Sequence, residues 1–365
     1  MNRPQRTSLA LALALGACQP TRADRVWSGA HVTVTSREGV ELCGGSIDFF
    51  DAYVVHVSEY WGADDRTEPF SLELRESGEE DVSGRAGADG AWAGAEQSVL
   101  HELGHVVTIS EDGVSAASLS EGFAAALDPI DRAGMWGIGS GPPEAFAFLQ
   151  RPEFEDRHYL PSAQLARFLI QRYGIETYRR AYVEARADHS AERIEAAFVA
   201  VFGDEIYDAF DAFETGPQCG LRAWECEPAL HPLLELPVDV QSPQDCTQDP
   251  EWVGAAPGGG EHWYPHRRFL LQVEADTEVV TVAQNARLSR STCADVCPSL
   301  SELPPGFEAM AAPASSGAVP VRTLTAGLHA FHLTPVEPSL PFSVRMERAL
   351  NVRDARRFEE LNARR

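Results

Sequence analysis

The chain has 365 residues, 44% of them apolar and 23% charged, a composition that is typical of a folded protein and excludes extended disorder. Its 30 basic residues are all arginine, and against 55 acidic residues they leave a net charge of −25. A chain this acidic repels nucleic-acid phosphates, and it shows no basic stripe, so we expect no nucleic-acid partner.

Residues 1–17 have the features of an export signal. Arg3 and Arg6 precede a short apolar run, Ser8 to Leu15, and this run falls short of the roughly twenty residues that span a membrane. Leu15-Gly16-Ala17-Cys18 then resembles the lipobox of bacterial lipoproteins. That resemblance implies cleavage after residue 17, a lipid anchor on Cys18 and a place in the outer membrane or at the cell surface. An ordinary secretory leader is the alternative, and it also predicts export.

Alternating segments and one amphipathic helix follow the leader. Residues 26–36 alternate apolar and polar side chains, which predicts a strand. Ser46 to Trp61 carries apolar residues at helical spacing and predicts a helix with Ser46 as its N-cap. Phe70 to Leu74 predicts a second strand, and a glycine-rich passage runs from Gly84 to Gly94.

The stretch VLHELGHVVT, residues 99–108, has the pattern of a metal-binding helix. Because His101 and His105 are four residues apart, a helix presents both imidazoles on one face. Glu102 projects about 100° around from His101, where it can take a proton from a water molecule beside the ion. Zinc suits this set, since it accepts nitrogen and oxygen ligands and keeps a fourth position for water. Chance alone gives about 0.03 such motifs in a chain of this composition.

Two glutamates are candidates for the third ligand. Glu111 lies in the polar segment Ser110 to Gly113, which has the character of a solvated turn. Glu121, within Ser120 to Ala124, is the better candidate. A competing interpretation makes Ser118-x-x-Glu121 a capping box, in which the carboxylate accepts from the N-cap amide. We expect metal ligation, because the coordination shell needs a third ligand.

These motifs resemble the gluzincins, zinc metallopeptidases in which a second helix supplies a glutamate, often within Ser-Glu-Gly-Phe-Ala. The metzincin extension requires glycine and histidine where this chain has Thr108 and Glu111, and it is absent. The resemblance covers residues 26–215 and implies an α+β zincin-like metallopeptidase domain: a small sheet, an active-site helix and a helical subdomain. It also implies that a substrate strand adds to a sheet edge formed by Gly87 to Gly94.

The stretch His158 to Gly174 is similar to the tyrosine, helix and Tyr-Gly that follow the third ligand in this family. The resemblance makes Tyr159 the candidate donor to the oxyanion, with His158 as its alternative; simple packing is the structural explanation. The sequence departs from the family at Ala125, where some gluzincins have an aspartate that orients a zinc-binding histidine. The group that orients the histidines is therefore unidentified.

The remainder of the chain changes from helical to β patterns. Ser162 and Ser190 are the expected N-caps of helices that Gly174 and Gly203 close, and a further helix is expected at residues 206–213. Residues 218–347 are rich in proline, glycine and cysteine and contain short alternating segments, which predict a smaller all-β domain, a sandwich. Residues 348–365 predict a charged helical tail.

Six cysteines remain besides Cys18, an even number that favours up to three disulfides in an exported protein, with the connectivity left open. The alternative is a four-thiolate zinc site formed by Cys219, Cys226, Cys293 and Cys297, although neither pair has the usual two-residue spacing.

The expected function is zinc-dependent hydrolysis of a peptide or protein substrate, with Glu102 as general base and His101, His105 and Glu121 as ligands. The alternative is a non-catalytic, surface-anchored binding protein built on a peptidase-like scaffold. The intact His-Glu-x-x-His motif favours the enzyme.

Overall fold

The computed structural model describes residues 24–36, 40–63, 68–75, 84–95, 98–127, 158–203, 223–257, 263–293, 317–337 and 339–349. The export signal, Cys18, the predicted domain boundary at residues 215–218, the helix expected at residues 206–213 and nearly all of the predicted tail lie outside the described residues. Among the described helices, none combines the length and the apolar character that a membrane crossing requires.

A five-stranded mixed sheet forms the base of the first unit, in the order β1-β2-β3-β5-β4. Its strands are β1 (Arg25–Ser28), β2 (Val32–Ser36), β3 (Phe70–Leu74), β4 (Gly84–Ala86) and β5 (Gly90–Ala93). The three middle strands β2, β3 and β5 are parallel, and the outer strands β1 and β4 are antiparallel to their neighbours. The alternation of Val32, Val34 and Leu72 turns one face of the sheet towards the core.

Two expectations about this sheet were wrong. The single strand expected at residues 26–36 is a hairpin, because the chain reverses at Gly29, whose N–H donates to the carbonyl of Val32. The expected edge at Gly87 to Gly94 contains β5, which pairs with β3 on one side and β4 on the other. Within the described residues the edge is therefore β4.

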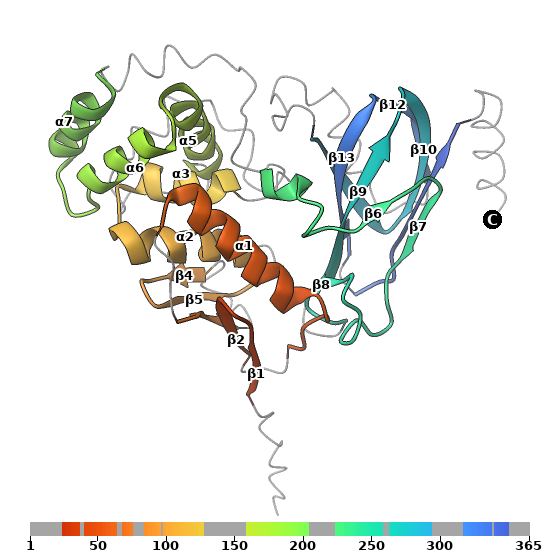
Figure 1. The fold of residues 1–365 in the computed structure, drawn as a ribbon. Helices are drawn as coiled ribbons and strands as arrows, with labels where there is room; N and C mark the ends of the chain where they lie inside the picture. Colours follow the sequence, from red (N-terminus) through yellow and green to blue (C-terminus); the bar gives the residue numbers. More distant parts are fainter. Residues whose placement is uncertain are drawn as a thin grey trace, which may run out of the picture.

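The six α-helices of this unit that fall within the described residues cover the sheet and continue the unit away from it (Figure 1). They are α1 (Ser46–Trp61), α2 (Val99–Asp112), α3 (Ala117–Leu127), α5 (Tyr159–Tyr173), α6 (Ile175–Glu184) and α7 (Ala191–Phe202). The bounds of α1 and β3 confirm the prediction, and so does Ser190, whose side chain accepts from the N–H of Arg193 at the start of α7. Helix α5 begins at Tyr159 rather than at Ser162.

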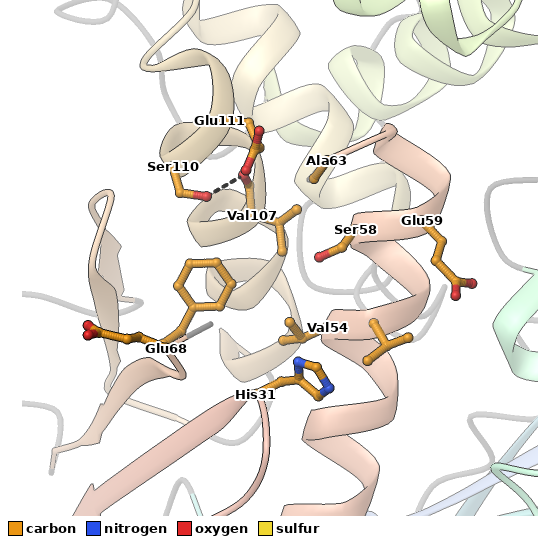
Figure 2. Close-up of a pocket in the computed structure, with 11 residues that line it drawn as sticks. His31, Val54, Ser58, Glu59, Ala63, Glu68, Val107, Ser110 and Glu111 are labelled. Atoms are coloured by element: carbon orange, nitrogen blue, oxygen red, sulfur yellow. Dashed lines mark hydrogen bonds between the residues drawn. The ribbon is translucent and has the colours of Figure 1, made fainter. Parts of the chain in front are cut away.

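A pocket of about 250 Å³ opens between α1, α2 and the first residues of β3 (Figure 2). Val54 and Val107 lie at its apolar side, and Glu59 and Glu111 are acidic residues among its lining. It lies along the second half of α2, past the histidine motif.

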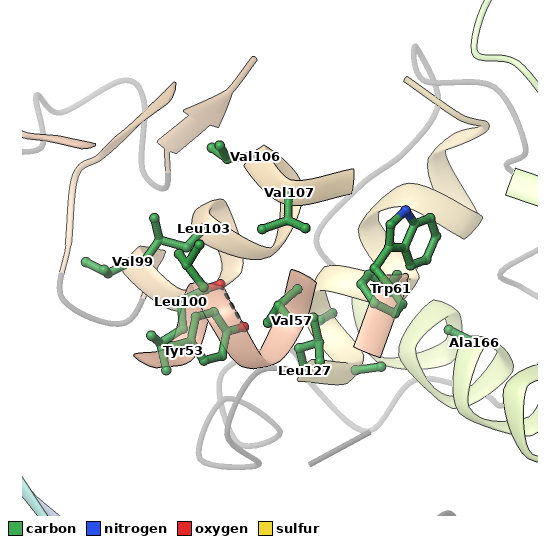
Figure 3. Close-up of a cluster of buried hydrophobic side chains, with 14 of the residues drawn as sticks. Tyr53, Val57, Trp61, Val99, Leu100, Leu103, Val106, Val107, Leu127 and Ala166 are labelled. Atoms are coloured by element: carbon green, nitrogen blue, oxygen red, sulfur yellow. Dashed lines mark hydrogen bonds between the residues drawn. The ribbon is translucent and has the colours of Figure 1, made fainter. Parts of the chain in front are cut away.

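The hydrophobic core fills the space between α1, α2 and α3 (Figure 3). Val57 and Leu103 are fully buried there, and the hydroxyl of Tyr53 donates to the carbonyl of Leu100 at 3.0 Å. That bond joins α1 to the first turn of α2, immediately before His101. The motif helix is therefore held by packing on one side and by a buried polar contact near its start.

The second unit consists of two sheets that share one hydrophobic core, and their strand pairs are antiparallel except for β6, which runs parallel to β9. One sheet has the order β12-β10-β14-β7 and the other the order β11-β13-β9-β6. Val240 and Val344 from the first sheet and Phe269 and Leu333 from the second belong to the same buried cluster, which is the packing of a β-sandwich. The strands are β6 (Leu233–Leu234), β7 (Val238–Gln241), β9 (Pro265–Val273), β10 (Thr277–Gln284), β11 (Ala286–Thr292), β12 (Gly317–Leu324), β13 (Gly327–Pro335) and β14 (Ser343–Arg348), and β8 (Val253–Gly254) pairs with β9.

The two units are joined by covalent and polar contacts. Cys43, just before α1, forms a disulfide with Cys246 of the second unit. Ser46 was expected to cap α1, but the N-cap position is Gly45 and the Ser46 hydroxyl exchanges two 3.0 Å hydrogen bonds with the backbone of Gly254. The contact across the units replaces the cap.

Candidate metal centre

His101 and His105 lie on the same face of α2, as their spacing predicts. Both are 4% exposed, and their Nε2 atoms are 3.1 Å apart. Gly104, which directly precedes His105, faces α3, where an added Cβ would lie 3.4 Å from Leu127 and 3.7 Å from Ala124. Helices α2 and α3 therefore pack closely at the level of the two histidines.

Glu121 comes from α3 and points at both histidines. Its Oε2 lies 2.8 Å from Nε2 of His105 and 3.2 Å from Nε2 of His101. The three side chains form the one group, among the described residues, in which three ligand atoms of histidine, cysteine or carboxylate residues lie within 4.8 Å of one another, and this group could hold a metal ion.

The capping-box interpretation of Glu121 is not supported. Helix α3 begins at Ala117, so Ser118 lies inside the helix and not at its N-cap. The Ser118 hydroxyl is buried and makes no hydrogen bond with the described residues. Glu121 is therefore directed at the histidines rather than at the start of its own helix.

The charge of Glu121 suits a ligand. Burial alone would raise the pKa of this carboxyl, but the neighbouring His105 and His101 outweigh burial and hold its pKa well below the ordinary value. The carboxylate is ionised at neutral pH, as coordination requires.

Glu102 packs against the edge strand of the sheet. It is 4% exposed, and a Cβ added to Gly84 of β4 would lie 2.7 Å from both its Cγ and its Oε1. Its carboxylate is thus on the side of α2 that faces β4.

Tyr159 lies at the first turn of α5, beside the histidines. Its ring and that of His101 are in edge contact, with 5.6 Å between their centroids. Tyr159 is partly exposed, whereas the alternative candidate His158 is fully buried. Of the two, Tyr159 therefore has the access that a substrate-facing donor needs.

Glu111 is not part of the group. It lies at the end of α2, where it lines the pocket of Figure 2 and its carboxylate is 4.0 Å from the guanidinium of Arg179. Two turns of helix separate it from His105, so it does not compete with Glu121.

The rival thiolate site is contradicted. Cys226 and Cys293 form a disulfide, so two of its four thiols are not available to a metal. Cys219 and Cys297 lie outside the described residues. The two disulfides that the structure describes, Cys43–Cys246 and Cys226–Cys293, agree with the expectation that cysteines of this chain are paired.

Sequence reasoning missed two residues next to the metal group. Nδ1 of His105 lies 3.4 Å from the hydroxyl of Ser120, which lies 3.4 Å from the hydroxyl of Tyr182 on α6. Ser120 directly precedes Glu121, so its position in the sequence motif could have identified it. Tyr182 follows the motif by more than seventy residues, and no signal in the sequence places it there.

No family model matches the sequence, and no curated protein matches it. Among solved structures, a two-domain M1 zinc metallopeptidase bound to L-arginine is 13% identical, with a TM-score of 0.34 over 52% of this chain and 50% of that chain. The aminopeptidase A of Legionella pneumophila in complex with aspartic acid is 8% identical, with a TM-score of 0.37 over 87% of this chain and 36% of that chain. The chain matches half or less of the length of these structures. Both TM-scores are below 0.5, so the interpretation of the site depends on its own geometry and not on this similarity.

Proposed function

We propose that the chain is a zinc-dependent metallopeptidase that hydrolyses peptide bonds, with His101, His105 and Glu121 as metal ligands. The observation that carries this proposal is the convergence of two imidazoles and one ionised carboxylate from two helices on one buried point.

The donor set fits zinc. Ligand atoms around a tetrahedral zinc ion lie about 3.3 Å from one another, and the three atoms here are 2.8, 3.1 and 3.2 Å apart. Two nitrogens and one oxygen are a set that catalytic zinc sites use, with the fourth position left to water. When bound, zinc lowers the pKa of water and polarises a carbonyl.

The other residues have roles that follow from their places. Glu102 accepts the proton of the attacking water and returns it to the leaving amine, for which its carboxylate must lie beside the histidines and not on the ion. Tyr159 donates a hydrogen bond to the oxygen on which negative charge develops. The backbone of β4, exposed at the sheet edge, can pair with an extended peptide.

Two substitutions test the proposal. Glu102→Gln should abolish peptide hydrolysis while one zinc per chain remains bound. Glu121→Gln should lower zinc content, as measured by elemental analysis after dialysis. Glu111→Gln is the matched control, because it removes a carboxylate from the same helix as Glu102 without touching the site. Turnover retained in Glu102→Gln, or a wild-type protein that holds no zinc, would reject the assignment.

We propose further that the protein is exported and anchored in the bacterial outer membrane through Cys18. Support comes from the basic, apolar and Leu-Gly-Ala-Cys segments of the leader. Intact mass should show an acylated chain that begins at Cys18. A Cys18→Ser variant should lose the lipid and leave the membrane fraction, and an unmodified wild-type N-terminus would contradict the anchor.

A further inference from the structure

A closed chain of hydrogen bonds links His105 to three hydroxyl groups. Nδ1 of His105 contacts the hydroxyl of Ser120, and this hydroxyl contacts that of Tyr182, each at 3.4 Å. The Tyr182 hydroxyl donates to Oγ1 of Thr108 at 3.2 Å, and Thr108 donates to the carbonyl of His105 at 3.1 Å. Ser120 and Thr108 are 1% exposed and Tyr182 is fully buried.

Each hydroxyl has a single hydrogen, and this fixes the direction of every bond in the chain. Thr108 donates its hydrogen to the carbonyl, so it accepts from Tyr182. Tyr182 has then used its hydrogen, so it accepts from Ser120. Ser120 in turn can only accept at its contact with His105. The hydrogen of that last bond must therefore be on Nδ1 of His105, so Nε2, which lies beside Glu121 and His101, is the nitrogen that can give up its hydrogen and bind a metal ion.

We propose that Ser120 and Tyr182 are positioning residues that orient His105 and hold its Nε2 as a metal ligand. The proposal rests on the proposed function, since it concerns the same metal group. It assigns to two neutral hydroxyls on α3 and α6 the orienting role that an aspartate would otherwise have. Ala125, at the expected place of that aspartate, is buried in α3.

Uncharged hydroxyl groups fit this site because acidic side chains are already present there. The carboxylate of Glu121 already lies within 3.2 Å of both histidines, and the buried Glu102 directly follows His101, so a further carboxylate would add repulsion within a buried region. The contacts of Ser120 are long for hydroxyl hydrogen bonds, so we expect the chain to orient the ring more than to bind it tightly. Loss of a partner behind a metal-binding histidine lowers metal affinity by about 10- to 100-fold, and we expect the lower end here.

The test removes one hydroxyl at a time and measures zinc affinity of the apo-protein by competition with a chelator. Ser120→Ala and Tyr182→Phe should each weaken zinc binding by about tenfold. Tyr178→Phe is the matched control. Tyr178 lies one turn earlier on α6, is also fully buried, and donates to the carbonyl of Leu119 at 2.8 Å, but does not contact His105. Its loss should change zinc affinity by less than about twofold, even if it lowers thermal stability.

A double variant separates orientation from general loosening. If Ser120 and Tyr182 act through one chain of hydrogen bonds, the double variant Ser120→Ala/Tyr182→Phe should bind zinc no more weakly than either single variant. The visible spectrum of the cobalt-substituted protein should shift in these variants and not in Tyr178→Phe. Equal affinities for wild type and Tyr182→Phe, additive losses in the double variant, or an equal loss in Tyr178→Phe would overturn the positioning role while zinc binding by the wild type stands. Failure of the wild type to bind zinc would overturn the proposed function itself.

Discussion

Glu102 depends on a glycine in a different element for its place in the site. Gly84 of β4 has a φ of +152°, which side chains rarely adopt, and an added Cβ would lie 2.7 Å from the carboxylate oxygen of Glu102 and 2.6 Å from the carbonyl of Trp92. The absent side chain is what lets the carboxylate lie between α2 and the sheet edge. The position of the general base is therefore set at residue 84 as much as at residue 102.

A Gly84→Ala substitution is expected to lower kcat for peptide hydrolysis by about tenfold or more, because it displaces the proposed general base. Zinc content should be unchanged, since no ligand contacts Gly84. Gly87→Ala is the control in the turn that follows β4, where an added Cβ meets nothing nearer than 3.9 Å. Similar kcat values for the two variants would contradict this role of Gly84.

At this scale the sequence predicted the residues that share a local motif. His101, Glu102 and His105 follow from one turn of helix, and Glu121 follows from its own short motif on the next helix. Gly84 and Tyr182 approach the site only through tertiary packing, so their positions could not be predicted from spacing.

Helices α3 and α5 approach each other closely at Gly122, directly after the proposed ligand Glu121. A Cβ at this position would lie 2.5 Å from the carbonyl oxygen and 3.2 Å from the Cβ of Ser162. Since Ser162 is one turn from Tyr159, the glycine sets the distance between the helix that carries the ligand and the helix that carries the proposed oxyanion donor.

Gly122→Ala should therefore lower both thermal stability and activity. Overpacking costs about 1–3 kcal/mol, and the better helix propensity of alanine returns about 1 kcal/mol. Gly104→Ala, also in a buried helix of the site, meets only ordinary contacts at 3.4 Å or more and should be neutral or stabilising. Thermal unfolding of the two variants decides the point: a Gly122→Ala protein as stable and active as Gly104→Ala would show that the close approach is not needed.

Elements with a strong local pattern were predicted well, but the roles of the serines expected to cap α1 and α5 were not. The apolar spacing of Ser46 to Trp61 gave the helix, but Ser46 bonds to Gly254, more than two hundred residues away, instead of capping it. Ser162 lies inside α5, which starts a turn earlier. The role of Ser46 is decided by a tertiary partner that no local rule includes, and the hydroxyl of Ser162 is buried without a hydrogen-bond partner among the described residues.

Across the whole molecule, a buried polar cluster lies between the helical unit and the sandwich. Arg268 of β9 and Glu225 form a 3.4 Å ion pair, both nearly buried. The guanidinium lies 4.9 Å from the ring centroid of Trp224 and 5.6 Å from that of Phe49 on α1. A buried ion pair of this kind helps to hold the two units together only if the neighbouring side chains stay uncharged or carry a compensating charge.

His231 is the titratable neighbour of this cluster, with its ring centroid 6.2 Å from that of Trp224 and 6.1 Å from that of Phe49. Burial, and then the positive charge of Arg268, lower its pKa from 6.5 to about 4. Because the folded protein binds this proton more weakly than the unfolded chain does, neutral His231 contributes its full stability above about pH 6.5 and loses it as the pH falls towards 4. The complete loss is about 3 kcal/mol, to order of magnitude.

The pH dependence of unfolding should therefore be less steep in a His231→Gln protein than in the wild type. Acidification also protonates carboxylates, but this effect is common to both proteins, so the difference between their Tm values isolates His231. We expect the Tm of the wild type minus that of the variant to be largest near pH 7 and to decrease by pH 4.5, because only the wild type loses the contribution of neutral His231. His31→Gln, which removes a histidine from the pocket beside α1, controls for the loss of one imidazole. Parallel curves for wild type and His231→Gln would show that protonation at this junction does not weaken the attachment of the two units.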